Sequence, residues 1–457
     1  MRFFEIANNG REHLSSTISN HDVQILEDSI EKGLKEFNIP LKNELRKGVE
    51  AVKDCSQKLF QYLLKLGKID EGKSRNLLFY KYRNYHEDDE YNSPETLEPN
   101  DDFLDLNRDL YKALRYLNTY IKNVEDSYPE YFSRLLLKTT ELMSTLIGLM
   151  KVDDIKSQGY GNSIASISVN KKRYEMRLTP LEIGGLFGKF LNKCSEHAIA
   201  VIMTSATLSV DHKFKKFNLD LGIDESKGEF LEIQSHFEYE KNAALFVDGR
   251  FPSQDDIDRE GAIIKRLRPV IDKTPGGIFI LTTSVKATHL IADKLRGQKD
   301  LKRKIICQYE NLSNTMMVES FKKDGHAILV GSVSFWAGVD VPGCALSLVI
   351  IDKLPFNSPS DPIFSARIRR FERNREKNAT PAFATITIPE AVITLRQGVG
   401  RLIRHEHDRG AMIICDPRLI NRNYGKIFLR SLPPMRRFDD LYALCNFLGS
   451  FSEQNAH

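Results

Sequence analysis

The feature that most constrains the fold is a series of short apolar runs in the second half of the chain. Each run is bounded by glycine, proline or charged residues, which is typical of buried strands. Amphipathic segments suited to helices alternate with these runs. This alternation predicts an α/β fold in which helices cover both faces of a parallel sheet. The apolar runs are 199–203, 277–281, 327–331, 346–351 and 411–415, and the helical segments are 256–272, 285–295, 315–322, 361–377 and 389–403.

The first half of the chain has a different periodicity. Apolar residues recur every three or four positions within 41–66, 106–124 and 132–149. This spacing places the apolar side chains on one face of each helix. We therefore expect a mainly helical region whose helices pack on one another as a bundle. The composition changes near residues 180–198, where we expect the main domain boundary.

Composition and charge narrow the class of protein. The 457 residues include 66 Lys and Arg against 62 Asp and Glu, a net charge of +4. A uniformly basic nucleic-acid coat and an acidic tail are excluded, whereas a local basic groove is not. The six cysteines lie far apart, so no CxxC motif exists and a reduced, intracellular compartment fits best. No apolar stretch approaches the ~20 residues of a membrane span and residues 1–10 are no secretory signal, so we expect a cytoplasmic protein.

Small hydroxyl residues follow two of the predicted strands. Thr204–Thr207 come after the run 199–203, and Thr282–Ser284 come after the run 277–281. The carboxyl ends of strands are where open α/β sheets bind ligands, and the N-terminus of a following helix can hold a phosphate. The alternative is a turn and a helix cap, in which the hydroxyls only satisfy backbone N–H groups.

A glycine-rich loop at 331–343 surrounds the chain's single tryptophan, Trp336. Its glycines allow the backbone to approach a ligand closely. Asp340 could accept a hydrogen bond from a ribose, from a basic side chain or from a neighbouring loop. For Phe335 and Trp336 the alternative is a hydrophobic contact that fixes the loop.

A further segment places an amide and two guanidinium groups at helical spacing. Gln397, Arg401 and Arg404 are four and three residues apart, so on a helix they would share one face. Forked guanidinium groups suit a polyphosphate whose charge shifts during cleavage. A solvated charged face would explain the spacing of the arginines, but not the glycines at 398 and 400.

Together these segments resemble the later motifs of superfamily 2 helicases of the DinG/XPD type. The resemblance covers about residues 180–450 in the family's order and spacing, and the helical half resembles, more loosely, the arch inserted in such helicases. It implies a RecA-like, P-loop-NTPase-type parallel sheet for the C-terminal part. The matching stretches are VIMTSATLS (201–209), 235–247, 277–295, 328–356 and 388–419.

The resemblance also implies roles for individual residues. The catalytic group facing the phosphates of ATP would be Gln397, Arg401 and Arg404, with the arginines as fingers. The residues beside the nucleotide would be Gly338, Asp340 and Gly400. The nucleic-acid-binding residues would be Thr282, Thr283, Ser284, Ser334, Phe335 and Trp336. The residues coupling the nucleotide state to DNA contact would be Thr204, Ser205, Ala206 and Thr207. The basic segment 367–377 would flank the DNA or be a solvated helix.

A motor of this family also needs a first RecA-like domain, which supplies a P-loop and an Asp-Glu-Ala-His magnesium box. No such box occurs in the chain. Gly67–Ser74 fits the P-loop pattern, but a long amphipathic helix precedes it and Asp70 and Glu71 would repel a triphosphate, so we interpret it as a turn. ATP with Mg²⁺ is therefore expected to depend on an absent N-terminal part. Neither an iron–sulfur cluster nor another metal site is expected in this chain.

Two function classes remain open at this point. The first is the C-terminal part of an ATP-dependent DNA helicase that acts on single-stranded or forked DNA, is inactive as an isolated chain and works with a separate N-terminal half. The second is a non-catalytic DNA-binding or regulatory protein derived from a truncated helicase. The expected domain map is a remnant of the first motor domain at 1–9, an arch-like region at 10–178, a return segment at 179–212 and a second RecA-like domain at 213–457.

Overall fold

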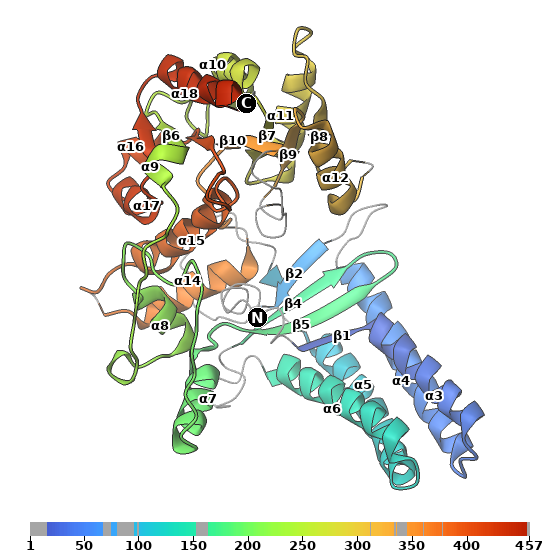
Figure 1. Ribbon diagram of the computed structural model, residues 1–457. Helices are drawn as coiled ribbons and strands as arrows, with labels where there is room; N and C mark the ends of the chain where they lie inside the picture. The colour runs from blue at the N-terminus through green and yellow to red at the C-terminus, as the bar shows by residue number, and fades with distance from the viewer. Residues whose placement is uncertain are drawn as a thin grey trace. The chain divides into compact units, whose positions relative to one another are not determined.

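The computed structural model describes residues 16–66, 75–79, 96–97, 100–151, 163–310, 312–332, 335, 345–359, 361–376 and 378–454. The chain divides into two compact units, and Figure 1 labels most of their helices and strands. Unit 1 comprises residues 1–205, 220–223 and 358–377, and unit 2 comprises 206–219, 224–357 and 378–457. Within the described residues, no helix combines the length and the apolarity needed to cross a membrane.

Long amphipathic helices dominate unit 1, which confirms the mainly helical character predicted for this half. They are α3 (Asn20–Glu36), α4 (Lys42–Leu66), α5 (Asp101–Glu125) and α6 (Pro129–Lys151). Their apolar stripes pack into one core, in which Leu59, Leu114 and Leu146 are completely buried. Helix α3 was not among the predicted segments.

Unit 1 also contains a five-stranded sheet that the sequence analysis did not predict. Its strands are β1 (Ser16–Ser19), β2 (Arg75–Phe79), β3 (Thr96–Leu97), β4 (Ser163–Val169) and β5 (Tyr174–Pro180), in the order β1-β5-β4-β2-β3. All neighbours are antiparallel except β2 and β3. Apolar residues of β4 and β5 join the helical core, and the Ser56 hydroxyl lies 2.8 Å from the Tyr174 hydroxyl. The sheet and helices of unit 1 therefore share one core.

Two further helices belong mainly to unit 1: α7 (Gly184–Glu196) and α14 (Pro362–Asn374). Ala366 of α14 packs against Ile164 and Leu181. The arginines of α14 have acidic partners in the same unit, because Arg370 Nε lies 2.9 Å from Glu182 and Arg367 lies 3.6 Å from Asp220. Part of the predicted basic flank thus serves packing within unit 1.

Unit 2 is built on a seven-stranded sheet in which every neighbouring pair is parallel. The strand order is β12-β6-β11-β10-β7-β9-β8. The strands are β6 (Ala243–Val247), β7 (Gly277–Leu281), β8 (Ile305–Cys307), β9 (Ile328–Gly331), β10 (Leu346–Ile351), β11 (Gly410–Ile414) and β12 (Arg436–Phe438). The predicted strands at 277–281, 327–331, 346–351 and 411–415 are confirmed, whereas β6, β8 and β12 were not predicted.

Helices cover both faces of this sheet, which confirms the predicted α/β class. Helices α10 (Arg259–Lys273), α11 (Val285–Arg296) and α18 (Leu441–Gln454) share a core with Ile278 and Ile280 of β7. Phe279 points to the other face because side chains alternate along a strand, and it contacts Phe321 of α12 (Asn314–Asp324) with ring centroids 4.7 Å apart. The remaining elements are α8 (Lys215–Leu221), η1 (Glu225–Lys227), α9 (Tyr239–Asn242), η3 (Phe383–Thr387), α15 (Ile388–Val399), α16 (Arg418–Asn421) and α17 (Gly425–Ser431).

Candidate functional site

The parallel sheet of unit 2 brings together segments that are far apart in sequence. Because all seven strands run in one direction, their carboxyl ends lie along one edge of the sheet. The segment after β7 and the segment after β9 meet there, since the Thr282 N–H donates to the Gly331 carbonyl at 2.8 Å. This edge is where sheets of this type bind ligands.

The hydroxyl residues after β7 do not all face the same way. Thr282 is fully buried, and its Oγ1 lies 2.7 Å from the Thr288 Oγ1 of α11. Ser284 is exposed and caps α11, because its Oγ accepts the Ala287 N–H at 3.2 Å. Thr283 is half-buried between them. Thr283, Ser284 and the start of α11 are thus the parts of this segment that can reach a ligand, whereas the Thr282 hydroxyl holds the turn together.

The loop after β9 is anchored at its start. The Ser332 N–H donates to Gln308 Oε1 at 2.7 Å, and the Ser332 hydroxyl contacts the Tyr309 hydroxyl. Phe335 is 1% exposed, so its ring packs inside unit 2 and does not present a stacking surface. The predicted site residues Ser334, Trp336, Gly338 and Asp340 lie outside the described residues.

The helix that carries Gln397 ends earlier than predicted, and this corrects the expected arrangement of the two arginines. α15 ends at Val399, and Arg401 and Leu402 continue in a tighter turn with N–H bonds to Gly398 and Val399. Arg401 and Arg404 therefore do not share a helix face with Gln397. The physical reason is Gly400, the C-cap residue, since glycine favours the end of a helix over its interior.

An acidic residue organises the loop that follows α15. Buried Asp408 accepts hydrogen bonds from the N–H groups of Arg404 and His405, at 2.8 and 2.9 Å. Burial lowers the pKa of the Arg404 guanidinium, and Asp408 partly offsets this shift. Leu402 and Ile403 are buried in between. The loop is thus anchored at both ends, and Arg401 is half-buried at its start.

The predicted strand at 199–203 is not formed. Its residues pair with no other strand in the described part of the chain, and Ile199 and Ile202 are 58% and 85% exposed. An apolar run forms a strand only where a neighbouring strand can accept its backbone hydrogen bonds. The boundary between the two units falls inside the hydroxyl segment, with Thr204 and Ser205 in unit 1 and Ala206 and Thr207 in unit 2.

One residue that the sequence analysis missed ties this segment to α15. Arg396 donates through Nη1 to the Ser209 carbonyl at 2.6 Å and through Nη2 to the Ala206 carbonyl at 2.9 Å. Burial lowers the pKa of Arg396, against an opposing effect of Glu232. The Ser209 hydroxyl in turn donates to Glu232 at 2.7 Å. The segment 206–209 is therefore fastened to the helix that precedes the Arg401 loop.

We expect Arg396→Ala to release residues 206–209. Two charge-assisted hydrogen bonds are lost, and each is worth about 1.5–3 kcal/mol, so backbone hydrogen exchange there should become about 10²-fold faster or more. Arg430→Ala is the matched control, because Arg430 contacts Asp211 nearby but its side chain is 62% exposed. Equal exchange at 206–209 in both variants, measured by mass spectrometry, would contradict the assigned role of Arg396.

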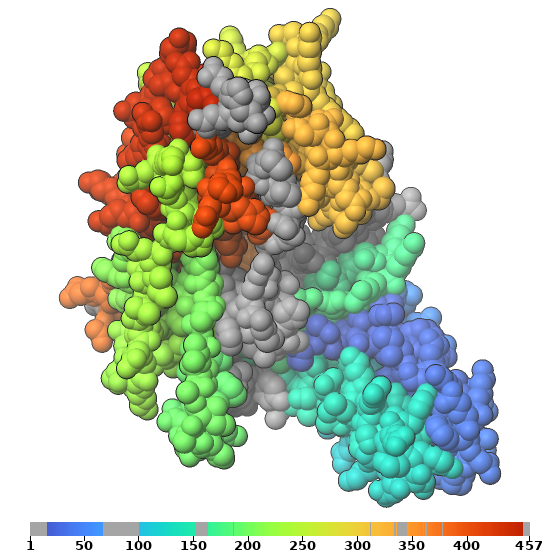
Figure 2. Space-filling view, viewed as in Figure 1, coloured from blue at the N-terminus to red at the C-terminus, as the bar shows by residue number. Residues whose placement is uncertain are grey.

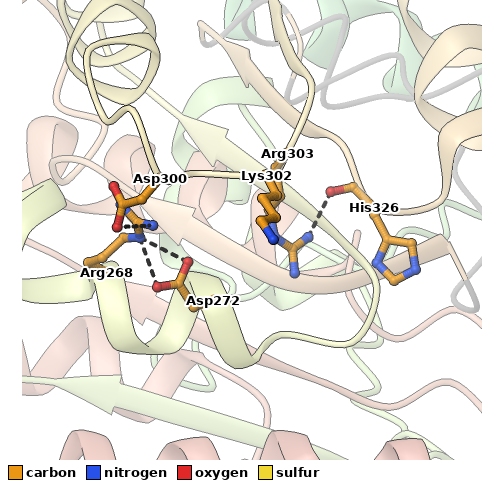
Figure 3. A pocket seen from close by; sticks show the side chains of 6 residues that line it. All are labelled: Arg268, Asp272, Asp300, Lys302, Arg303 and His326. Carbon is orange, nitrogen blue, oxygen red and sulfur yellow. Dashed lines mark hydrogen bonds and ion pairs between the residues drawn. The ribbon is translucent and has the colours of Figure 1, made fainter.

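A separate polar pocket in unit 2 lies near the opposite edge of the sheet. Figure 3 shows Arg268 paired with Asp272 and Asp300, and Arg303 donating to the His326 carbonyl. Arg303 also donates to the carbonyls of Thr274 and Gly276, which precede β7. These contacts join the loops at the amino ends of the strands. The pocket is explained by packing and contains none of the predicted site residues.

Comparison with known proteins shows which domains and proteins this chain is similar to. Residues 267–435 match the family of helicase C-terminal domains. The chain is 42% identical over 279 residues to ATP-dependent DNA helicase YoaA of Haemophilus influenzae, a match covering 61% of this chain and 42% of that protein. It is 39% identical over 300 residues to the YoaA of Escherichia coli, covering 66% and 45%. It is 34% identical over 262 residues to the 3'-5' exonuclease DinG of Bacillus subtilis, covering 56% and 27%.

A solved structure of apo XPD has the same fold. It superposes with a TM-score of 0.51 and 15% identity, and the match covers 95% of this chain and 75% of that chain. The sheet of unit 2 is thus RecA-like. Residues 267–435 thus match a helicase C-terminal domain, and the chain is similar to the C-terminal region of helicases of the DinG/XPD type. It spans less than half the length of the two YoaA relatives.

Proposed function

We propose that this chain is the C-terminal part of an ATP-dependent DNA helicase. Together with a P-loop-bearing first motor domain, it would couple ATP hydrolysis to translocation on single-stranded DNA and to duplex unwinding. The observation that carries the proposal is the helicase C-terminal match at 267–435, which includes the segments after β7, β9 and α15. Relatives named as ATP-dependent DNA helicases support the same reaction class.

The proposed nucleotide site is completed from both motor domains. The first domain would hold ATP and Mg²⁺ through its P-loop and magnesium ligands. Gln397, Gly400, Arg401 and Arg404 would face the phosphates from this chain, with Gly338 and Asp340 contributing from the loop after β9. Guanidinium groups stabilise the charge that develops on the transferred phosphoryl group, which is the role that we assign to Arg401 and Arg404.

The proposed DNA track follows the segments after β7 and β9. Exposed Ser284 and the free N–H groups at the start of α11 would contact a phosphate, and Ser334 and Trp336 would contribute from the loop after β9. Thr282 and Phe335 would support these contacts from inside the fold, because both are buried. Thr204–Thr207, fastened in part by Arg396, would transmit the nucleotide state to the DNA.

The proposed domain map follows the same reasoning. Residues 10–178 would form the arch-like region, 179–212 the return segment of the first motor domain and 213–457 the second motor domain, with 1–9 as a remnant of the first. The exposed apolar run at 199–203 would then add a strand to the sheet of the first motor domain, which would bury Ile199 and Ile202.

The test is ATP hydrolysis, measured with and without single-stranded DNA. We expect no hydrolysis by this chain alone and DNA-stimulated hydrolysis when it is joined to the first motor domain of the Haemophilus influenzae relative. A joined protein that binds DNA but does not hydrolyse ATP would favour a non-catalytic DNA-binding protein. DNA-stimulated hydrolysis by this chain alone, abolished by Lys73→Ala, would show that Gly67–Ser74 is a true P-loop and would overturn the domain map.

A further inference from the structure

Three potential metal ligands converge beside the segment after β9. His289 lies in α11, Cys307 ends β8 and Glu310 lies three residues further along the chain. Their donor atoms are all within 4.8 Å of one another, and Cys307 Sγ lies 3.9 Å from His289 Nδ1. None of the three belongs to the predicted helicase site. The cluster is therefore a feature that the proposed function does not use.

The three donors form a set that suits zinc. Thiolate, imidazole and carboxylate are the ligands that Zn²⁺ binds in proteins, and in a tetrahedral site such atoms lie roughly 3.5 Å apart. The sulfur and the nitrogen are already close to this separation, and the donor atoms of all three residues, which lie within 4.8 Å of one another, would draw together around the ion by side-chain rotation. Cys307 is 3% exposed, His289 is half-buried and Glu310 is exposed, which gives the cluster a dry interior and an open side.

The carboxylate of Glu310 can bind an ion without losing its present partner. Each of its two oxygens accepts one hydrogen bond from Arg296, at 2.8 Å. A carboxylate oxygen has a second lone-pair direction, so Arg296 would become an outer partner that orients the ligand. Because this ion pair is partly exposed, a small rotation of the carboxylate costs little.

We propose that His289, Cys307 and Glu310 form a binding site for a divalent transition-metal ion of the zinc class. The ion would be held by His289 Nδ1, Cys307 Sγ and one oxygen of Glu310, and its fourth position would be taken by solvent. The proposal does not depend on the helicase function, since it rests on the donor set alone.

Binding requires that the Cys307 thiol loses its proton. Burial and the neighbouring Glu310 raise the pKa of this thiol to about 12, so it is protonated at neutral pH in the absence of an ion. The thiol lies 3.3 Å from the Gln308 carbonyl. When the metal–sulfur bond forms, the sulfur–hydrogen bond breaks and one proton passes to the solvent, with no change in oxidation state.

The ion would fix the start of the loop after β9. Gln308 and Tyr309 lie between two of the ligands in sequence, and both contact Ser332. Tyr309 has a left-handed backbone with φ of 70°, which is uncommon for a residue other than glycine and marks a constrained segment. A metal bound to Cys307 and Glu310 would hold this segment, and with it Ser332.

The surface that contains α11, β8 and α12 appears in gold to amber in Figure 2.

The test is titration of the reduced, metal-free full chain with Co²⁺, a spectroscopic substitute for Zn²⁺. We expect one ion per chain, a sulfur-to-cobalt charge-transfer band and loss of the band when Zn²⁺ is added. Cys307→Ser should abolish the band. Cys445→Ser is the matched control, because Cys445 is another buried thiol of the same core, and it should leave the band unchanged.

Because Cys307→Ser changes a buried residue and could impair folding, two further variants change the other two ligands. His289→Gln and Glu310→Gln change more accessible side chains and should each weaken Co²⁺ binding about tenfold or more. Zn²⁺ should also slow hydrogen exchange at residues 308–310 in the wild type and not in Glu310→Gln. A missing charge-transfer band in the wild type, or unchanged affinity in both of these variants, would overturn the proposal.

Discussion

Arg401→Ala is expected to lower the rate of ATP hydrolysis by about 10³-fold or more when this chain is joined to a P-loop-bearing first motor domain. The expectation follows from the role that we propose for Arg401, a guanidinium that stabilises charge on the transferred phosphoryl group. The loss should appear in kcat, because charge develops in the transition state and not in bound ATP. Binding of single-stranded DNA should change little.

The structure makes this variant a clean test of the guanidinium. Leu402 and Ile403 are buried and Asp408 binds the N–H groups of Arg404 and His405, so the loop has anchors that do not involve the Arg401 side chain. Arg401→Lys should also be strongly impaired, because lysine keeps the charge but lacks the planar fork.

Arg437→Ala, a change at an exposed position of β12, serves as the control and should hydrolyse ATP at the wild-type rate. The rate should be measured at saturating ATP and DNA. A kcat for Arg401→Ala within a few-fold of wild type would show that Arg401 is not a finger, and the assignment would pass to Arg404.

The central strands of unit 2 could be predicted because each is a short run of almost entirely apolar residues. β7 and β10 are buried over their whole length, and a strand covered on both faces is apolar at nearly every position, Ser347 of β10 being the exception. The edge strand β12 could not be predicted in this way. It has three residues, two of them exposed arginines, and among the strands that the structure describes it pairs only with β6. Such a strand is defined by its neighbour and leaves no apolar pattern.

The sequence of β4 contains a pattern that predicts a strand in the sheet of unit 1. In β4, buried Ile167 and Val169 alternate with the more accessible Ser166 and Ser168, which is the two-residue period of a half-buried strand. Helix α3 likewise places Val23, Leu26 and Ile30 at helical spacing. Both elements could therefore have been predicted from the sequence, although their patterns are shorter than the apolar stripes of α4, α5 and α6.

The candidate site was predictable in its location but not in its geometry. The segments after β7 and β9 lie at one edge because a parallel sheet places them there. The position of Arg401 relative to Gln397 depends on where α15 ends. The helix ends before Gly400, so the spacing expected for a continuous helix does not apply. Arg396 could not be found from the sequence at all, since its partners are the backbone carbonyls of Ala206 and Ser209, which have no side-chain signal.

Arg259→Ala is expected to destabilise unit 2 by about 3–5 kcal/mol. Arg259 is 1% exposed at the start of α10 and forms an ion pair with Asp352, which is equally buried. It also donates to the carbonyls of Asp352 and Cys415, at 2.7 and 3.1 Å. One side chain thus joins α10 to the carboxyl ends of β10 and β11. Its removal leaves a buried carboxylate and two carbonyls without their donor.

Hydrogen exchange in β10 and β11 is the appropriate measurement, because global unfolding of a chain with two units is not two-state. Exchange of the slowest amides should accelerate roughly 10²- to 10⁴-fold, which corresponds to the expected loss of free energy. Arg268→Ala is the matched control on the same helix. Its ion pairs involve the accessible carboxylates of Asp272 and Asp300, so it should cost about 1 kcal/mol or less.

The pH dependence identifies the cause of the loss. Burial raises the pKa of Asp352, and Arg259 opposes this shift, so removing Arg259 should raise the pKa further. A carboxyl group whose pKa is higher in the folded state stabilises the fold at low pH and loses that contribution as the pH rises through the folded-state pKa. The stability that Arg259→Ala loses relative to the wild type should therefore become smaller as the pH falls from the folded-state pKa of Asp352 in the variant to its folded-state pKa in the wild type.

A double variant separates the buried charge from the lost packing. Arg259→Met with Asp352→Leu removes both charges and keeps apolar volume at each position, and such replacements are often neutral or stabilising. We expect it to recover most of the stability lost in Arg259→Ala. If the double variant were as unstable as the single one, the hydrogen bonds to the Asp352 and Cys415 carbonyls, and not the ion pair, would be what holds α10 to the sheet.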